Sequence, residues 1–233
     1  MAGISAMLSD VVRLFFPHHC GGCGTDIIER SQFLCLKCQS DLPHTGYEKI
    51  AYNPVEKIFA GRVPVVAASS QFYFSKGHLI QHLIHQLKYK GNTDAGEYLG
   101  TEMGRALLAS NRFCNLDVIV PLPLFADKEY KRGYNQAEVI CKGMALMMQL
   151  PVQRNNVVRI RYTDSQTKKH RTERWQNVEN SFAVKNKTAL AGKSILLVDD
   201  VITTGATLEA CSQAVLAIEG TRLSIVTLAI ASS

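Results

Sequence analysis

Long hydrophobic runs are scarce in this sequence of 233 residues. The apolar stretch at residues 1–17 is interrupted by Asp10 and Arg13, and it is shorter than the roughly 20 residues that cross a bilayer. Its apolar positions recur at helical spacing, so we expect a docked amphipathic helix and no membrane partner. Internal repeats and low-complexity segments are also absent. A chain with 46% hydrophobic and 20% charged residues has the composition of a globular protein.

A chain of this size needs no disulfides, and four of its seven cysteines instead form two close pairs. The pairs are Cys20 with Cys23 and Cys35 with Cys38, a Cys-x2-Cys-x11-Cys-x2-Cys spacing suited to tetrahedral zinc. Four thiolates leave no open position for water, so we expect a structural zinc ion. A redox dithiol is the alternative. Cysteines used in this way indicate a reduced, cytoplasmic protein.

The pattern divides the chain into two units, 1–60 and 61–233. Residues 18–44, the four-cysteine module, precede a tract without strong periodicity at residues 45–64. In the second unit we expect strands at 65–74, 117–120, 157–161, 182–184, 194–198 and 223–230, and helices at 77–87, 94–109, 135–148 and 208–218. Strands and helices that alternate in this way predict a mainly parallel sheet covered by helices.

Two adjacent acids, Asp199 and Asp200, follow the buried strand at 194–198, where parallel sheets bind ligands. The next residues lead into a helix whose first N–H groups favour a phosphate, and they are Thr203, Thr204, Gly205, Ala206 and Thr207. Two acids would repel a phosphate unless a sugar lay between them, and a ribose offers two hydroxyls to two carboxylates. The loop has no Gly-Lys-Ser/Thr, which excludes a P-loop. The plain alternative is a strand-turn-helix with capping threonines.

The order of four apolar residues, two acids, two apolar residues and Thr-Thr-Gly-x-Thr is similar to the phosphoribosyl pyrophosphate (PRPP) motif of type I phosphoribosyltransferases. Besides the cysteine pairs, the chain contains the motifs Lys-Tyr-x-Gly at 88–91, Arg-Gly-Tyr-Asn-Gln-Ala at 132–137, and Thr-x-x-Gln followed by Arg-x-x-Asn within 163–177. Through these motifs, nearly the whole chain resembles the ComF family. The segment at 167–174 is more basic than that pattern.

The resemblance implies an α/β chain with a type I phosphoribosyltransferase-like fold, a mainly parallel sheet and a small N-terminal four-cysteine zinc module. It implies that Asp199 and Asp200 hold the ribose hydroxyls of PRPP or ribose 5-phosphate. Residues 203–207 would hold the 5′-phosphate, and Mg²⁺ would accompany PRPP.

Positive charge is uneven in the chain, whose net charge is +6, because residues 161–187 hold seven Lys/Arg against three Asp/Glu. Arg171 and Arg174 lie in the stretch at 162–180, which is too long for a simple turn. We interpret it as a lid whose arginines act in catalysis on pyrophosphate, with a solvated charged helix as the alternative. A second basic group follows the Pro-Leu-Pro turn and consists of Lys128, Lys131 and Arg132. We interpret it as a pyrophosphate site, with a solvated turn as the alternative.

Two functions remain open from the sequence, because no residue stands out as a general base. The first is a phosphoribosyltransferase with an unspecified acceptor. The second is a non-catalytic protein that binds PRPP or single-stranded DNA and acts in DNA uptake with a helicase-type competence partner, as the resemblance implies. Pyrophosphate and a DNA backbone both attract cations, so the basic residues do not separate the two.

Overall fold

The computed structural model of this protein describes residues 18–27, 32–75, 78–160 and 181–231. The helix predicted at 1–17 and the lid predicted at 162–180 lie outside these residues. Within the described ranges, no helix has the length and apolar character needed to cross a membrane.

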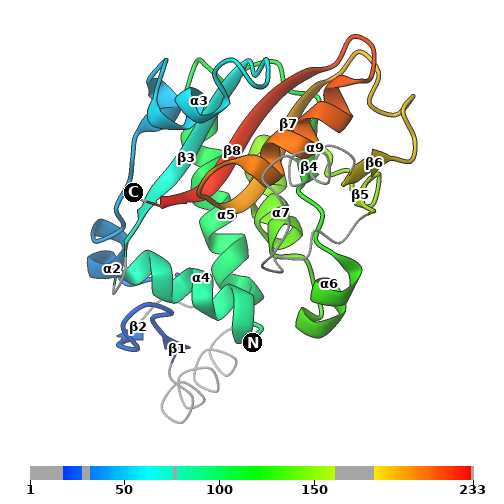
Figure 1. The fold of residues 1–233 in the computed structure, drawn as a ribbon. Coiled ribbons are helices and arrows are strands. Elements are labelled where there is room, and N and C mark those ends of the chain that lie inside the picture. Colours follow the sequence, from blue (N-terminus) through cyan, green and yellow to red (C-terminus); the bar gives the residue numbers. More distant parts are fainter. Residues whose placement is uncertain (1–17, 28–31, 76–77, 161–180, 232–233) are drawn as a thin grey trace, which may run out of the picture.

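Four parallel strands form the central sheet (Figure 1). Their order across the sheet is β3 (Ala67–Phe74), β8 (Arg222–Ala231), β7 (Ser194–Ile202) and β4 (Val118–Pro121). The two middle strands, β7 and β8, are buried over most of their length, which explains why their sequences are nearly continuous apolar runs. The mainly parallel sheet predicted from the sequence is confirmed.

Helices cover both faces of this sheet, and alternate residues of each strand face opposite layers. One layer contains α4 (Leu79–Tyr89), α5 (Thr93–Leu108) and α7 (Gln136–Met148), which share a core with Leu196 and Val198 of β7. The other contains α3 (Pro54–Phe59) and α9 (Ala206–Leu216), which share a second core with Ile195 and Leu197. By the same alternation, the two residues that follow Val198 in β7 face opposite helical layers.

Shorter elements complete the described chain. They are the hairpin β1 (His18–His19) and β2 (Asp26–Ile27), helix α2 (Leu36–Ser40), the 3-10 helix η1 (Tyr47–Lys49), helix α6 (Ala126–Arg132), and the antiparallel pair β5 (Val157–Arg159) and β6 (Phe182–Val184). The pair β5 and β6 flanks the predicted lid.

The tract at 45–64 has more regular structure than its weak periodicity predicts, because it contains η1 and α3. Asn53 caps α3 by accepting hydrogen bonds from the N–H groups of Val55 and Glu56, and Pro54 is the first helical residue. Val55 and Phe59, four residues apart, are fully buried. An Asn-Pro start and an i, i+4 apolar pair were the available signals, but six residues are too few for periodicity to show.

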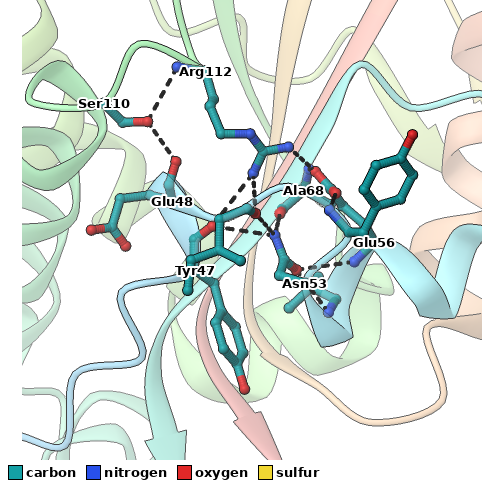
Figure 2. A network of polar contacts seen from close by, with 10 residues as sticks. Tyr47, Glu48, Asn53, Glu56, Ala68, Ser110 and Arg112 are labelled. Atoms are coloured by element: carbon teal, nitrogen blue, oxygen red, sulfur yellow. Dashed lines mark hydrogen bonds and ion pairs between the residues drawn. The ribbon is translucent and has the colours of Figure 1, made fainter.

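A polar network fixes this tract to the sheet and to the loop after α5 (Figure 2). The Asn53 side chain donates a hydrogen bond to the carbonyl of Ala68 in β3, at 2.8 Å. Arg112 forms an ion pair with Glu56 and donates to the carbonyl of Ile50, so three separate segments meet here. The connection from the four-cysteine module to the sheet is therefore held by buried Asn53 and by partly buried Glu56 and Arg112.

Helices α5 and α7 approach each other closely through glycine. A Cβ atom added to Gly143 would lie 2.0 Å from the carbonyl oxygen of Glu97, and one added to Gly100 would lie 2.1 Å from that of Ile140. Larger residues would force the helices apart. The layer that backs the acid strand thus depends on two small residues.

Strand β7 extends four residues beyond its predicted end at 198. Asp199, Val201 and Ile202 remain paired with Thr227, Ala229 and Ile230 of β8. The acid pair is consequently part of the strand, and strand geometry governs where the two side chains point.

Candidate functional site

The acid pair lies at the carboxyl end of β7, and its two side chains face different layers. Asp200 shares a face with Leu196 and Val198, and its Oδ2 is 2.8 Å from the Nζ of Lys88 at the end of α4. Asp199 faces the layer of α9, and its Oδ1 accepts a hydrogen bond from the N–H of Asp200 at 2.8 Å. A strand alternates its side chains, so adjacent acids cannot be equivalent.

Asp199 is the member of the pair whose protonation is most perturbed. Burial, and then the charge of Asp200, raises the pKa of Asp199 to about 8, while Lys88 and Arg159 act in the opposite direction. Near neutral pH the free protein therefore keeps a proton on Asp199. In that state Asp199 can donate as well as accept hydrogen bonds.

The loop after β7 turns at Gly205 into the start of α9. Gly205 is the N-cap and has a φ of +76°, which favours glycine. Thr203, Thr204 and Ala206 are exposed and Thr207 is partly buried. Because the cap residue has no side chain, the first N–H groups of the helix and its positive dipole end are suited to an anion from outside.

The tract at 45–64 packs against this turn. A Cβ atom on Gly205 would lie 2.6 Å from Cγ2 of Ile58 in α3, so only glycine fits. The guanidinium of Arg62 lies 3.3 Å from the carboxylate of Glu209 and 3.5 Å from the carbonyl oxygen of Thr204. These contacts hold the turn from the side of α3.

The basic residues predicted for pyrophosphate lie on or at the end of α6, which follows β4. Lys128 and Lys131 are exposed, whereas Arg132 is partly buried, contacts the side chain of Gln136 and lies 5.8 Å from the ring centre of Tyr89. Strands β4 and β7 are parallel neighbours, so α6 and the turn at Gly205 leave the same edge of the sheet. Their contact with an anion stays a prediction.

The Arg-Gly-Tyr-Asn-Gln-Ala motif joins several elements at this edge. The side chain of Asn135 accepts a hydrogen bond from Ala137 N at 2.9 Å and donates one to the carbonyl of Leu122 at 3.0 Å. The Tyr134 hydroxyl donates to the carbonyl of Leu87 in α4. These two residues therefore position β4, α4 and α7 relative to one another.

Two cations near the acid pair, Lys88 and Arg159, were not predicted as site residues. Lys88 belongs to the Lys-Tyr-x-Gly motif and Arg159 to a predicted strand, and neither pattern indicates that the residue lies near the acids. Arg159 stacks 3.9 Å from the ring centre of Phe125 and 5.2 Å from that of Phe182. Burial lowers the pKa of Arg159, and the charge of Asp199 opposes that change. An arginine within an otherwise apolar strand was the signal available for it. Arg171 and Arg174 lie outside the described residues.

The four paired cysteines converge as predicted. Their Sγ atoms all lie within 4.8 Å of one another, and those of Cys23 and Cys35 are 3.7 Å apart. That separation matches the edge of a tetrahedron with metal–sulfur distances of about 2.3 Å, so the set can hold a metal ion. Hydrogen bonds from the side chain and amide of Thr25 lower the pKa of Cys23 to about 6, which favours the thiolate that a metal requires.

This cluster is packed on α4. Cys20 and Cys38 belong to the same buried core as Leu83 of α4, and a Cβ atom on Gly22 would lie 2.8 Å from Leu79. The Gln86 side chain donates a hydrogen bond to the carbonyl of Gly21 at 3.0 Å. The same helix thus contacts the cysteine cluster along its length and the acid pair at its end.

Comparisons with known proteins agree with this architecture. Residues 140–232 match the family described as phosphoribosyl transferase domain. Competence protein F of Haemophilus influenzae is 28% identical over 199 residues, which are 85% of this chain and 78% of that protein. Competence protein ComFC of Bacillus subtilis is 37% identical over 99 residues, 42% of this chain and 38% of that protein. DNA utilization protein YhgH of Salmonella typhi is 28% identical over 137 residues, 58% of this chain and 60% of that protein.

The last two alignments cover less than two thirds of the relatives' own lengths. The family match contains β7, the turn at Gly205 and α9, and the sheet of the structure is parallel, so this part of the chain has a phosphoribosyltransferase-like fold. These competence proteins and the cysteine cluster near the start of the chain support its resemblance to the ComF family.

The raised pKa of Asp199 predicts a pH dependence of stability that Asp199→Asn removes. The folded protein retains a proton on Asp199 up to a pKa of about 8, whereas the unfolded chain loses it at the ordinary, lower value. The folded state therefore binds more protons in this window, and this contribution to stability is lost as pH rises. We expect the free energy of unfolding of Asp199→Asn, relative to wild type, to increase from about pH 5 to about pH 8.

Urea unfolding of both proteins across this range, without ligand, measures that difference. Parallel curves for wild type and variant would show that Asp199 ionises in the folded protein as it does in the unfolded chain.

Proposed function

We propose that this chain binds PRPP or ribose 5-phosphate at the end of β7. The observation that carries the proposal is the acid pair Asp199 and Asp200, placed directly before a helix start that is capped by Gly205 alone. The carboxyls would receive the two ribose hydroxyls, and the turn at 203–207 would receive the 5′-phosphate through backbone N–H groups and threonine hydroxyls. The resemblance to type I phosphoribosyltransferases supports the same assignment.

Magnesium would bind with PRPP rather than at a site built by the protein alone. In the described part of the chain, the four cysteines are the only group of three or more potential ligands that lie together. The diphosphate oxygens of PRPP supply the hard ligands that Mg²⁺ prefers. Mg²⁺ bound in this way neutralises charge on the pyrophosphate.

The proposed reaction is transfer of the phosphoribosyl group to an acceptor, with pyrophosphate as the leaving group. The bond from C1 of the ribose to the pyrophosphate oxygen breaks as a bond from C1 to the acceptor forms. Lys128, Lys131 and Arg132 would stabilise the departing charge. Arg171 and Arg174 would close over it and exclude water.

The alternative is a protein that binds PRPP or single-stranded DNA without catalysis and acts in DNA uptake or utilisation. The names of the relatives, competence protein and DNA utilization protein, favour it, as does the net charge of +6. A helicase-type competence partner belongs to this alternative. In either case we place the protein in the cytoplasm, where thiols stay reduced.

The four-cysteine module would hold one structural zinc ion. All four ligands are thiolates, which suit zinc, and together they leave no coordination position for water. Metal binding then stabilises a module too small to fold alone.

Replacing both acids should remove ribose 5-phosphate binding. In the double variant Asp199→Ala, Asp200→Ala the ribose hydroxyls lose both acceptors, so we expect calorimetric affinity for ribose 5-phosphate and for PRPP to fall by about a hundredfold or more. The control is Asp41→Ala, Glu219→Ala, which replaces two acids at exposed positions away from the site. If the acid-pair variant bound these ligands with the same affinity as the control, the ligand site would lie elsewhere.

Release of pyrophosphate separates the two functions. An active transferase, incubated with PRPP and Mg²⁺ and a panel of bases or single-stranded DNA, should release pyrophosphate faster in the presence of one acceptor than without any. The acid-pair variant should abolish this release. Tight PRPP binding with no release above the uncatalysed rate would favour the non-catalytic alternative.

Cys23→Ser should abolish zinc binding. An alcohol is a far weaker ligand than a thiolate, and the remaining three cysteines leave the tetrahedral set incomplete. The zinc content of the purified variant, measured by metal analysis, should fall from one ion per chain toward zero. The control is Cys114→Ser, which replaces an exposed cysteine outside the cluster and should keep one equivalent of zinc. A full equivalent in Cys23→Ser would overturn the ligand set.

A further inference from the structure

Lys88 is the charged residue closest to the acid pair among the described residues. It lies in the last turn of α4, and its ammonium is 2.8 Å from Oδ2 of Asp200. Both groups are largely removed from solvent, because the Lys88 side chain is 22% exposed and that of Asp200 is 6% exposed. A buried carboxylate is costly without an opposite charge nearby, and Lys88 supplies that charge.

The contact is ionic and leaves hydrogen-bonding capacity on the carboxylate. Within the described residues, Oδ2 of Asp200 is buried and accepts no bond with hydrogen-bond geometry. A carboxylate has about four lone-pair positions. The ammonium can therefore stabilise the charge of Asp200 while a hydroxyl from a ligand supplies the missing hydrogen bond.

The position of Lys88 is fixed by the neighbours of α4 rather than by its own side chain. Leu83 and Leu87 are fully buried, and the carbonyl of Leu87 accepts a hydrogen bond from the Tyr134 hydroxyl. One residue earlier, the Gln86 side chain is bonded to Gly21 in the four-cysteine module. The last turn of α4 is thus held from two sides, and Lys88 is directed by a rigid element.

Other charges near the pair do not replace Lys88. Asp199, the neighbour in β7, adds negative charge, and Arg159 from β5 interacts with Asp199 from the opposite layer. Cys211 of α9 also lies on the side of Asp199. Lys88 is the ionic partner of Asp200 on the α4 side.

We propose that Lys88 is a positioning residue that keeps Asp200 charged and oriented to accept a ribose hydroxyl. This inference rests on the proposed sugar-phosphate site. It differs from a role for Lys88 as a pyrophosphate contact, because a positioning role concerns the ribose, which ribose 5-phosphate and PRPP share.

The test compares Lys88→Met with wild type by calorimetric titration of ribose 5-phosphate and of PRPP with Mg²⁺. Methionine keeps a similar length and apolar stem without the charge. We expect both ligands to bind about tenfold or more weakly at pH 7, by similar factors, because charge-assisted hydrogen bonds to the ribose are lost. Lys88→Arg should retain most of the affinity. Lys90→Met, an exposed lysine just beyond the same helix, should bind as wild type does.

The pH profile distinguishes positioning from a purely structural role. Without a positive neighbour the acid pair takes up protons more readily, so the pH at which ribose 5-phosphate binding reaches half its maximum should move upward in Lys88→Met. The midpoint should return toward the wild-type value in Lys88→Arg. Zinc content and thermal unfolding of each variant verify that the fold is intact.

Three results would decide against the inference or its basis. Unchanged ribose 5-phosphate affinity in folded Lys88→Met would overturn it. A loss confined to PRPP would instead make Lys88 a pyrophosphate contact. If wild type bound neither ligand, the proposed sugar-phosphate site itself would fail, and this outcome is visible before any variant is made.

Discussion

The alternation of side chains along β7 from Ile195 to Asp200 is the constraint on which the site depends. This strand lies in the middle of the sheet and is buried on both faces, so each residue belongs to one of two cores. The alternation extends to the two acids and ends after them, because Val201 packs on the core of Val198 and Ile202 belongs to the core of Leu197. Asp200 meets Lys88 from one layer, while Asp199 lies in the layer that contains Arg159 and α9. Two identical side chains consequently have different surroundings, and burial raises the pKa of Asp199.

Helix α4 links the four-cysteine module to this strand. Its first half packs on the cysteine cluster through Leu79 and Leu83, and its last turn carries Lys88 to Asp200. The helix is 11 residues long, which is about 16 Å at 1.5 Å per residue. The module and the acid pair thus contact different parts of one short helix.

The elements that the sequence predicted well are those in which local pattern and burial agree. Continuous apolar runs identified β7 and β8, and the helical spacing of buried residues identified α4, α5 and α7. The cysteine cluster was predictable because its ligand spacing is itself local. Helices α3 and α6, of six and seven residues, were missed because one or two turns do not establish a period. Helix α3 is stabilised by the Asn53 cap and by the packing of Val55 and Phe59, which a short sequence pattern does not reveal.

Contacts between distant segments explain why the site was predicted only in part. The acids and the turn at Gly205 are contiguous in sequence, so their chemistry could be read from residue order. Lys88 is more than a hundred residues before Asp200, and nothing in its own motif shows that α4 ends beside β7. Its pairing follows from the packing of α4 between the cysteine cluster and the sheet. Residue order can therefore indicate which groups receive a ligand, whereas the groups that set their charge depend on tertiary packing.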